Sequence, residues 1–181
     1  MTVNGSYSND ESPVFVNGFK NTTSSNSYHI RTGFSCNAGS RLVLNANASF
    51  NSTDISYSIQ KNQNQDITNK SADAGVKWQI AKKTFFDGNF SFNAYQNSRL
   101  ANNEDIKLLN ASLRRILGKN NRFEIRLAAF DILNEQLHIQ QSAYGNIVEN
   151  SKTPTLARYY MLSLTYNLSG FDSKLNKGRF W

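Results

Sequence analysis

An alternation of apolar and polar residues runs through the segment Tyr160-Met-Leu-Ser-Leu-Thr-Tyr-Asn-Leu168. In an extended strand, the tyrosines and leucines at its even positions share one face, and Ser163, Thr165 and Asn167 lie on the other. A period of two is typical of a β-strand with one apolar and one polar side. The segment therefore predicts a strand that separates two different environments.

Five further stretches show the same alternation, and two more show it weakly. The clear stretches are residues 28–38, 42–51, 73–80, 86–94 and 122–129, and the weak ones are residues 106–115 and 2–8. Most of them are close to the 9 to 11 residues that cross an outer membrane as a tilted strand. The sequence predicts an all-β chain of seven or eight strands, of which the first is too short to span a membrane.

The expected connections between these strands fall into two lengths that alternate along the chain. Residues 38–41, 81–84 and 117–121 are short, and Gly39 and Gly118 supply the positive φ that tight hairpins need. Residues 9–27, 51–72, 97–105 and 135–157 are long and polar. Short turns at one end and long loops at the other are typical of a transmembrane β-barrel.

Aromatic residues on the apolar faces sort into two levels. Those near the short turns are Trp78, Phe86, Phe123 and Tyr166, and those near the long loops are Tyr28, Phe50, Phe92 and Tyr160. Such levels match the interfacial girdles of membrane barrels. The predicted fold is an antiparallel up-and-down transmembrane β-barrel segment; the alternative is a soluble β-sandwich or ligand-binding barrel, whose apolar faces point inward.

Composition excludes several other classes of protein. Only 39% of the 181 residues are apolar, too few for helical membrane spans, and 12% are aromatic, too many for a disordered chain. The net charge of +7 raises nucleic acid as a partner, but the 20 Lys and Arg residues are scattered, and we expect no such partner. A single cysteine and two histidines leave no zinc pattern, so we expect neither metal nor cofactor.

No catalytic constellation is found, so we expect the protein not to be an enzyme. His138 has Asp131, Glu135 and Ser142 nearby in the sequence, but no Gly-x-Ser-x-Gly motif accompanies them. We interpret Asp131 as a turn cap where a strand ends, together with Asn134. The remaining loop carboxylates are interpreted as solvated charge: Asp54, Asp66, Asp73, Glu104 and Asp105.

Two segments near the C-terminal end resemble a known family. Arg122-Phe-Glu-Ile-Arg-Leu-Ala-Ala-Phe-Asp-Ile-Leu-Asn134 and Leu156-Ala-Arg-Tyr-Tyr-Met-Leu-Ser-Leu-Thr-Tyr-Asn-Leu168 are similar to the end of the outer-membrane β-barrel family related to TonB-dependent receptors of Bacteroidetes-type bacteria. The strongest matches are residues 130–134 and 158–162. The earlier strands resemble the family only in their spacing and in their Asn-rich alternation.

The resemblance implies a barrel of about 22 strands filled by an N-terminal plug domain. It also implies a TonB-binding segment and solute import powered by the inner-membrane proton gradient. We find no signal peptide, plug or TonB segment in the sequence, and we expect the chain to be the final third of such a barrel. Residues 1–170 would then form the C-terminal barrel portion and residues 171–181 a basic, aromatic periplasmic tail.

The expected location is the outer membrane of a Gram-negative cell. The expected partners are outer-membrane lipid, the missing N-terminal strands and plug, and TonB through the missing part. The last strand would run toward the periplasm, where Tyr166, Phe171 and Trp181 are candidates for an aromatic assembly signal. The alternative functions are a self-contained small outer-membrane barrel, serving as an adhesin or envelope structural protein, and a soluble ligand-binding β-barrel.

Charged residues on the polar faces are the candidates for contact with a plug or a solute. They are Arg31, Lys77, Arg122, Glu124 and Arg126. Several positive groups in one lumen would favour anionic or hydrogen-bonding solutes. Packing against a plug for stability alone is the alternative role of these charges.

Overall fold

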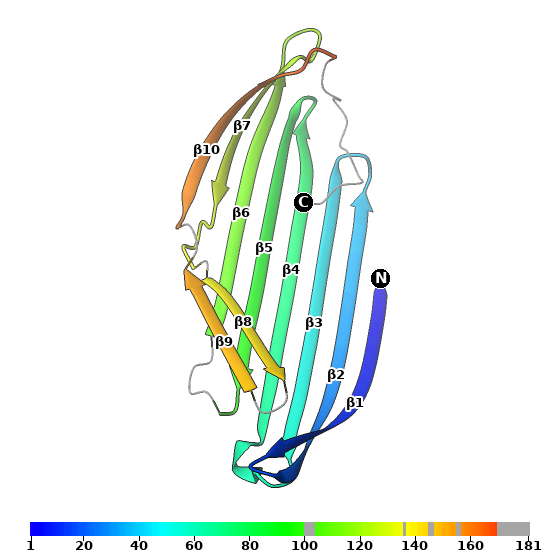
Figure 1. Cartoon of the computed structure of the whole chain (residues 1–181). Helices are drawn as coiled ribbons and strands as arrows, with labels where there is room; N and C mark the ends of the chain where they lie inside the picture. The colour runs from blue at the N-terminus through cyan, green and yellow to red at the C-terminus, as the bar shows by residue number, and fades with distance from the viewer. Residues whose placement is uncertain (100–103, 136, 145–146, 155–156, 170–181) are drawn as a thin grey trace.

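The fold is a single large antiparallel sheet with a small second sheet beside it (Figure 1). The computed structural model describes residues 1–99, 104–135, 137–144, 147–154 and 157–169. The large sheet has the strand order β1-β2-β3-β4-β5-β6-β7-β10, so successive strands are neighbours. Its strands are β1 (Thr2–Val16), β2 (Phe19–Ala38), β3 (Leu42–Tyr57), β4 (Gln65–Ala81), β5 (Thr84–Asn97), β6 (Glu104–Leu117), β7 (Phe123–Phe130) and β10 (Tyr159–Tyr166). The predicted up-and-down all-β fold is confirmed.

Two short elements complete the described part of the chain. Strands β8 (Leu137–Tyr144) and β9 (Ile147–Pro154) pair as a separate hairpin, and η1 (Lys61–Gln63) is one turn of 3-10 helix. The hairpin falls in residues 135–157, which were predicted as a long loop, and it lies beyond the ends of β7 and β10 in Figure 1. Among the described residues, no helix is long and apolar enough to cross a membrane.

Strands β1 to β4 are much longer than the sequence predicted. The four strands have 15, 20, 16 and 17 residues, whereas β7 and β10 have 8 each. The prediction of loops over residues 9–27 and 51–72 is therefore wrong for most of their length. Strands continue there because backbone hydrogen bonds hold the ladder together without any apolar alternation.

The first hairpin shows this correction most clearly. Strand β1 pairs with β2 from Thr2 opposite Gly33 to Val16 opposite Phe19, so it is not a short remnant. Asn17 and Gly18 form the connection with φ of 50° and 81°. Positive φ at both central residues is the signature of a type I′ hairpin turn, for which Asn-Gly is a preferred sequence. With 15 residues, β1 is long enough to span a membrane, so the prediction of a first strand too short to do so is wrong.

The two ends of the sheet differ in how the strands connect. At one end, here called the turn end, the connections are residues 39–41, 82–83 and 118–122. Gly39 and Gly118 have φ of 66° and 81°, which confirms the predicted hairpin turns. At the opposite end, here called the loop end, lie the Asn17-Gly18 turn, residues 58–64 and the β8–β9 hairpin.

Strand register places the predicted apolar faces on one side of the sheet, here called the outer face. One row of register partners across five strands contains Trp78, Phe86, Leu113, Leu127 and Leu162. These side chains remain accessible, and Leu127 and Leu162 are 54% and 66% exposed. The opposite side, the inner face, carries the predicted polar residues.

The inner face also holds two buried apolar clusters. From the sequence, only polar residues were predicted on this face, and these clusters were not predicted. Val43, Phe85 and Ile116 pack together toward the turn end, and all three are at most 2% exposed. Ile55, Tyr57 and Ile67 pack together toward the loop end. Side chains on the inner face therefore shelter one another, whereas those on the outer face are left open.

Candidate functional site

Apolar residues on the outer face form a belt, here called the apolar band. It is made of Tyr7, Tyr28, Ile30, Phe34, Leu44, Phe50, Trp78, Phe90, Leu113, Phe123, Ile125, Leu127, Tyr160, Leu162, Leu164 and Tyr166, all at least 37% exposed. An exposed apolar surface of this extent on a water-soluble protein would mark an interaction site. The band therefore needs an apolar partner along its whole length.

Aromatic rings pair at both borders of the apolar band. Tyr7 and Tyr28 lie 5.0 Å apart, centroid to centroid, at the border that faces the loop end. Phe123 and Tyr166 lie 4.8 Å apart at the border that faces the turn end. Cross-strand ring pairs of this kind stabilise neighbouring strands and occupy the levels expected of interfacial girdles.

Beyond the band lies a polar region, here called the distal half. It comprises residues 9–16 of β1, 19–26 of β2, 52–57 of β3 and 65–70 of β4. Its outer face carries five exposed charged residues: Glu11, Lys20, Asp54, Asp66 and Lys70. Charged side chains on a lipid-facing surface are strongly destabilising. The distal half is therefore built to stand in water.

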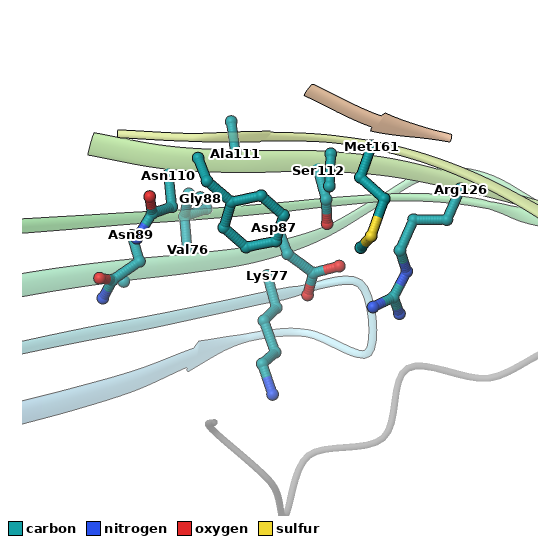
Figure 2. A pocket seen from close by; sticks show the side chains of 13 residues that line it. Val76, Lys77, Asp87, Gly88, Asn89, Asn110, Ala111, Ser112, Arg126 and Met161 are labelled. Atoms are coloured by element: carbon teal, nitrogen blue, oxygen red, sulfur yellow. The ribbon is translucent and has the colours of Figure 1, made fainter. Parts of the chain in front are cut away.

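The inner face contains an open hollow opposite the apolar band, here called the central hollow. It encloses about 470 Å³, and its lining includes Lys77, Asp87, Asn89, Asn110, Ser112, Arg126 and Met161. Lys77 and Asp87 are register partners on β4 and β5. Figure 2 shows Lys77, Asp87 and Arg126 extending to the same side of the sheet, while Ala111 points to the other.

Glu124 forms ion pairs with two arginines at the edge of the central hollow. Its carboxylate lies 3.4 Å from Nη1 of Arg114 and 3.7 Å from Nε of Arg126. The Arg114 guanidinium stacks 4.2 Å from the centroid of the buried Phe85 ring, a favourable cation–π geometry. Arg126 is the more exposed of the two arginines, at 36% against 18%, so its guanidinium is the one available to a molecule in the hollow.

The five charged residues predicted for the polar face do not form one cluster. Lys77 and Arg126 line the central hollow, with Glu124 beside them. Arg31 lines a smaller, separate hollow of about 220 Å³. Arg122 precedes β7 at the turn end, is exposed, and accepts a hydrogen bond from the Asn167 amide through its carbonyl oxygen at 2.8 Å.

Sequence reasoning missed three members of this site. Asp87 and Ser112 line the central hollow, and Arg114 shares the Glu124 carboxylate with Arg126. Asp87 was not among the charged residues predicted for the polar face, and its register opposite Lys77 gives it a role. Arg114 lies in a strand whose alternation is weak, so its face was not evident before the pairing was known.

The two segments that resemble a receptor family meet at one turn after β7. The Asp131 amide donates to Asn110 Oδ1 at 2.8 Å, and Asp131 Oδ1 accepts the Glu135 amide at 3.0 Å. Asn134 Oδ1 accepts the Arg158 amide at 3.1 Å. Asp131 and Asn134 therefore cap this turn, as predicted, and their hydrogen bonds join the end of β7 to the start of β10.

A match to a known family identifies what covers the apolar band. The sequence model of the outer membrane protein beta-barrel family matches residues 2–166. The chain belongs to the outer membrane protein beta-barrel family. No curated protein and no solved structure matches the chain. Within this outer-membrane barrel, the apolar band is the lipid-facing surface and the inner face is the lumen side.

The sequence contains one group of residue types that occur in catalytic triads, His138 with Asp131, Glu135 and Ser142. The side chains of His138 and Ser142 lie outside the described residues. In the part of the chain whose side chains are described, no three His, Cys, Asp or Glu residues form a group that could hold a metal ion. The central hollow has three cations, two carboxylates and several carboxamides and hydroxyls around it, which suits hydrogen bonding to a solute or a polypeptide.

Proposed function

We propose that this barrel belongs to a TonB-dependent-type receptor of the Gram-negative outer membrane and takes part in solute import. The main support is the capped turn after β7, which is hydrogen-bonded to the residue before β10. It brings together residues 130–134 and 158–162, which are the segments most similar to that receptor family. Arg158 contacts both sides of the turn, since its Nη1 also donates to the Ile132 carbonyl oxygen at 3.2 Å.

The edges of the sheet support a larger barrel than these eight strands. In the described part of the chain, β1 and β10 each pair on one side only. Unpaired backbone groups cost several kcal/mol each in lipid, so both edges need strand partners. β1 has 15 residues and β10 has 8, so they match poorly as partners of each other. We propose that further strands lie between them and that a plug domain fills the lumen.

The central hollow is proposed to contact this plug or the solute itself. Lys77, Arg114 and Arg126 face Asp87 and Glu124, which leaves a small positive excess among these five groups. A surface of this kind favours an anionic or hydrogen-bonding group over a cation. Import by binding and release needs no catalytic residue, so we propose no enzymatic activity and no cofactor.

The proposed orientation places the loop end outside the cell. Outer-membrane barrels have short periplasmic turns and longer extracellular connections. β10 then runs toward the periplasm. The proposed periplasmic tail, residues 171–181, lies outside the described residues, as do two of the candidate aromatic assembly residues, Phe171 and Trp181.

A binding experiment with TonB tests the receptor assignment. We expect the full gene product, solubilised from outer membranes, to be retained by an immobilised periplasmic domain of TonB from the same organism. The reading frame upstream of residue 1 is expected to encode a plug and a signal peptide. A stop codon directly upstream, together with no retention by TonB, would overturn the assignment and favour a self-contained small barrel.

A further inference from the structure

The turn end of the sheet gathers basic residues that are scattered in the sequence. Strands β2 to β7 are neighbours in chain order, so the turns at residues 39–41, 82–83 and 118–122 follow one another along this end (Figure 1). No aspartate or glutamate occurs in residues 38–42, 81–84 or 114–123. The five cations of these turns are here called the basic rim: Arg41, Lys82, Lys83, Lys119 and Arg122.

The loop end, in contrast, has charges of both signs. Basic residues of the distal half and its connections, such as Lys20, Lys61 and Lys70, are accompanied by the carboxylates of Glu11, Asp54 and Asp66. The basic rim is therefore a property of one end of the sheet. The overall positive charge of the protein does not explain this difference between the two ends.

Hydrogen bonds hold the three turns of the basic rim together. Lys83 Nζ donates to the Gly118 carbonyl oxygen at 2.9 Å, which links the second turn to the third. The Gln79 amide donates to the Arg41 carbonyl oxygen at 2.7 Å, which links the first turn to the strand that leads into the second. The backbone positions of the cations are therefore fixed relative to one another before a partner binds.

Most of the basic rim is available to a partner. The exposed members are Arg41, Lys82, Lys119 and Arg122. In the described part of the chain, none of these side chains forms an ion pair. Glu124 lies two residues after Arg122, but its carboxylate is on the inner face and pairs with Arg114 and Arg126. A row of exposed cations without carboxylates favours an anionic partner.

The basic rim lies where the apolar band ends. Trp78 precedes Lys82 by four residues, and Phe123 directly follows Arg122. Both rings are exposed, and exposed rings at a membrane border mark the level of the lipid headgroups. The headgroup layer on each side of the hydrocarbon core is roughly 5–8 Å thick, and a strand advances about 3.4 Å per residue. Cations a few residues beyond the rings therefore reach the depth of the lipid phosphates.

Arg115 adds a cation on the lipid-facing side of the same end. It is exposed on the outer face, and its register partner is Ile125 of the apolar band. An arginine at the edge of a lipid-facing surface can lay its stem along the hydrocarbon and keep its guanidinium among the headgroups. Lipid meets this residue directly, whereas a soluble protein beyond the membrane surface does not. Arg115 therefore favours lipid as the partner.

We propose that the basic rim and Arg115 bind the phosphate groups of anionic phospholipids in the leaflet next to the turn end. Lysine and arginine donate charge-assisted hydrogen bonds to phosphate oxygens, and each basic residue near an anionic membrane surface adds to the binding. In the orientation proposed above, this is the periplasmic leaflet. The inference rests on the apolar band and the turn end, and not on the receptor assignment.

The test is native mass spectrometry of the full gene product, purified in detergent, with two lipids that share the same acyl chains. Dioleoyl phosphatidylglycerol is the anionic lipid, and dioleoyl phosphatidylcholine is the zwitterionic control. We expect the anionic lipid to bind at least about tenfold more tightly. Inorganic phosphate at the same concentration is expected not to displace it, because free phosphate lacks the acyl chains that contact the apolar band.

Two triple variants separate the basic rim from the charge of the protein as a whole. Arg41→Gln, Lys82→Gln and Lys119→Gln together remove one cation from each turn, and we expect them to weaken phosphatidylglycerol binding by at least about tenfold. Phosphatidylcholine binding should not change, which verifies that the variant is folded. Lys20→Gln, Lys61→Gln and Lys70→Gln remove the same charge from the opposite end, and the preference for the anionic lipid should remain.

A third variant keeps the charge and changes the side chains. Arg41→Lys, Lys82→Arg and Lys119→Arg together should preserve the preference for phosphatidylglycerol. Equal affinity of the wild-type protein for the two lipids, equal losses in the two glutamine variants, or displacement by inorganic phosphate would each overturn the proposal. Tighter binding of a hexaglutamate peptide than of either lipid would also overturn it and would assign the basic rim to an acidic polypeptide. None of these measurements involves TonB or transport.

Discussion

Strand β2 passes through two regions of the molecule that share a backbone ladder but differ in their side chains. In residues 28–38, tyrosine, isoleucine and phenylalanine on the outer face form part of the apolar band. In residues 19–26, the same face carries Lys20 and then Thr22, Ser24 and Asn26. β2 pairs with β1 over residues 19–33 and with β3 over residues 23–38, so the ladder crosses from one region into the other without a break.

The comparison shows that the side-chain pattern depends on the environment of each face, and not on whether the segment is a strand. A strand alternates in polarity only where its two faces meet different environments. The apolar band separates lipid from a watery lumen, so alternation is strong there. Both faces of the distal half meet water or a small buried cluster, so its strands lack an apolar outer face and resemble loops in sequence.

The largest expected effect contrasts the two faces of β5 within the band region. Phe85 is fully buried on the inner face, so Phe85→Ala should leave a cavity and lower the free energy of unfolding by about 3–5 kcal/mol. Phe90, on the outer face of the same strand, is 37% exposed, and lipid can fill the space that Phe90→Ala vacates. Urea unfolding of the full chain in lipid vesicles measures both. Equal losses would mean that the inner face is not a packed core.

An introduced arginine should destabilise the protein in the apolar band but not in the distal half. Ala46→Arg places a guanidinium in the apolar band and is expected to destabilise the inserted chain by about 2–4 kcal/mol. Ser24→Arg places the same group on the outer face of the distal half, where we expect a change within about 0.5 kcal/mol. Unfolding midpoints in vesicles compare the two. Similar losses at both positions would place the distal half in lipid.

A smaller loss of stability is expected from a substitution in the Asn17-Gly18 turn, which connects β1 and β2 in the distal half. Gly18 has φ of 81°, and Gly18→Val should cost about 1–2 kcal/mol because a β-branched residue is strained there. Gly5→Ala on β1 is the control, since a Cβ at Gly5 would meet only the His29 carbonyl oxygen, at an ordinary 3.7 Å. If Gly18→Val were tolerated as well as Gly5→Ala, the turn would not depend on positive φ.

The outer face of the band region could be predicted almost completely from the sequence. The alternation in residues 28–38, 42–51 and 160–166 gave the correct faces, and three of the predicted rings, Tyr28, Phe123 and Tyr166, take part in the ring pairs at the borders of the band. Each residue that faces lipid has to be apolar, so this pattern can be recognised in the sequence without knowing which strands pair. The strands of the distal half were missed because their outer face has no apolar pattern and their inner face has only the small cluster of Ile55, Tyr57 and Ile67, although Asn17-Gly18 was a usable hairpin signal.

The candidate site depended on pairing that the sequence does not specify. Lys77, Glu124 and Arg126 were assigned to the polar face, but the register alone brings Asp87 opposite Lys77 and Arg114 next to Glu124. The buried cluster of Val43, Phe85 and Ile116 was missed for the same reason, because each residue is a single apolar position on an otherwise polar face.

Cysteine labelling on intact cells tests most directly whether the apolar band lies in lipid while the distal half stands outside. The native Cys36 is first replaced by Ala, and Ser24→Cys and Ala46→Cys are then compared with a membrane-impermeant maleimide. We predict complete labelling at position 24 and none at position 46 until the protein is denatured in sodium dodecyl sulfate. Equal labelling of both positions in intact cells would contradict the account.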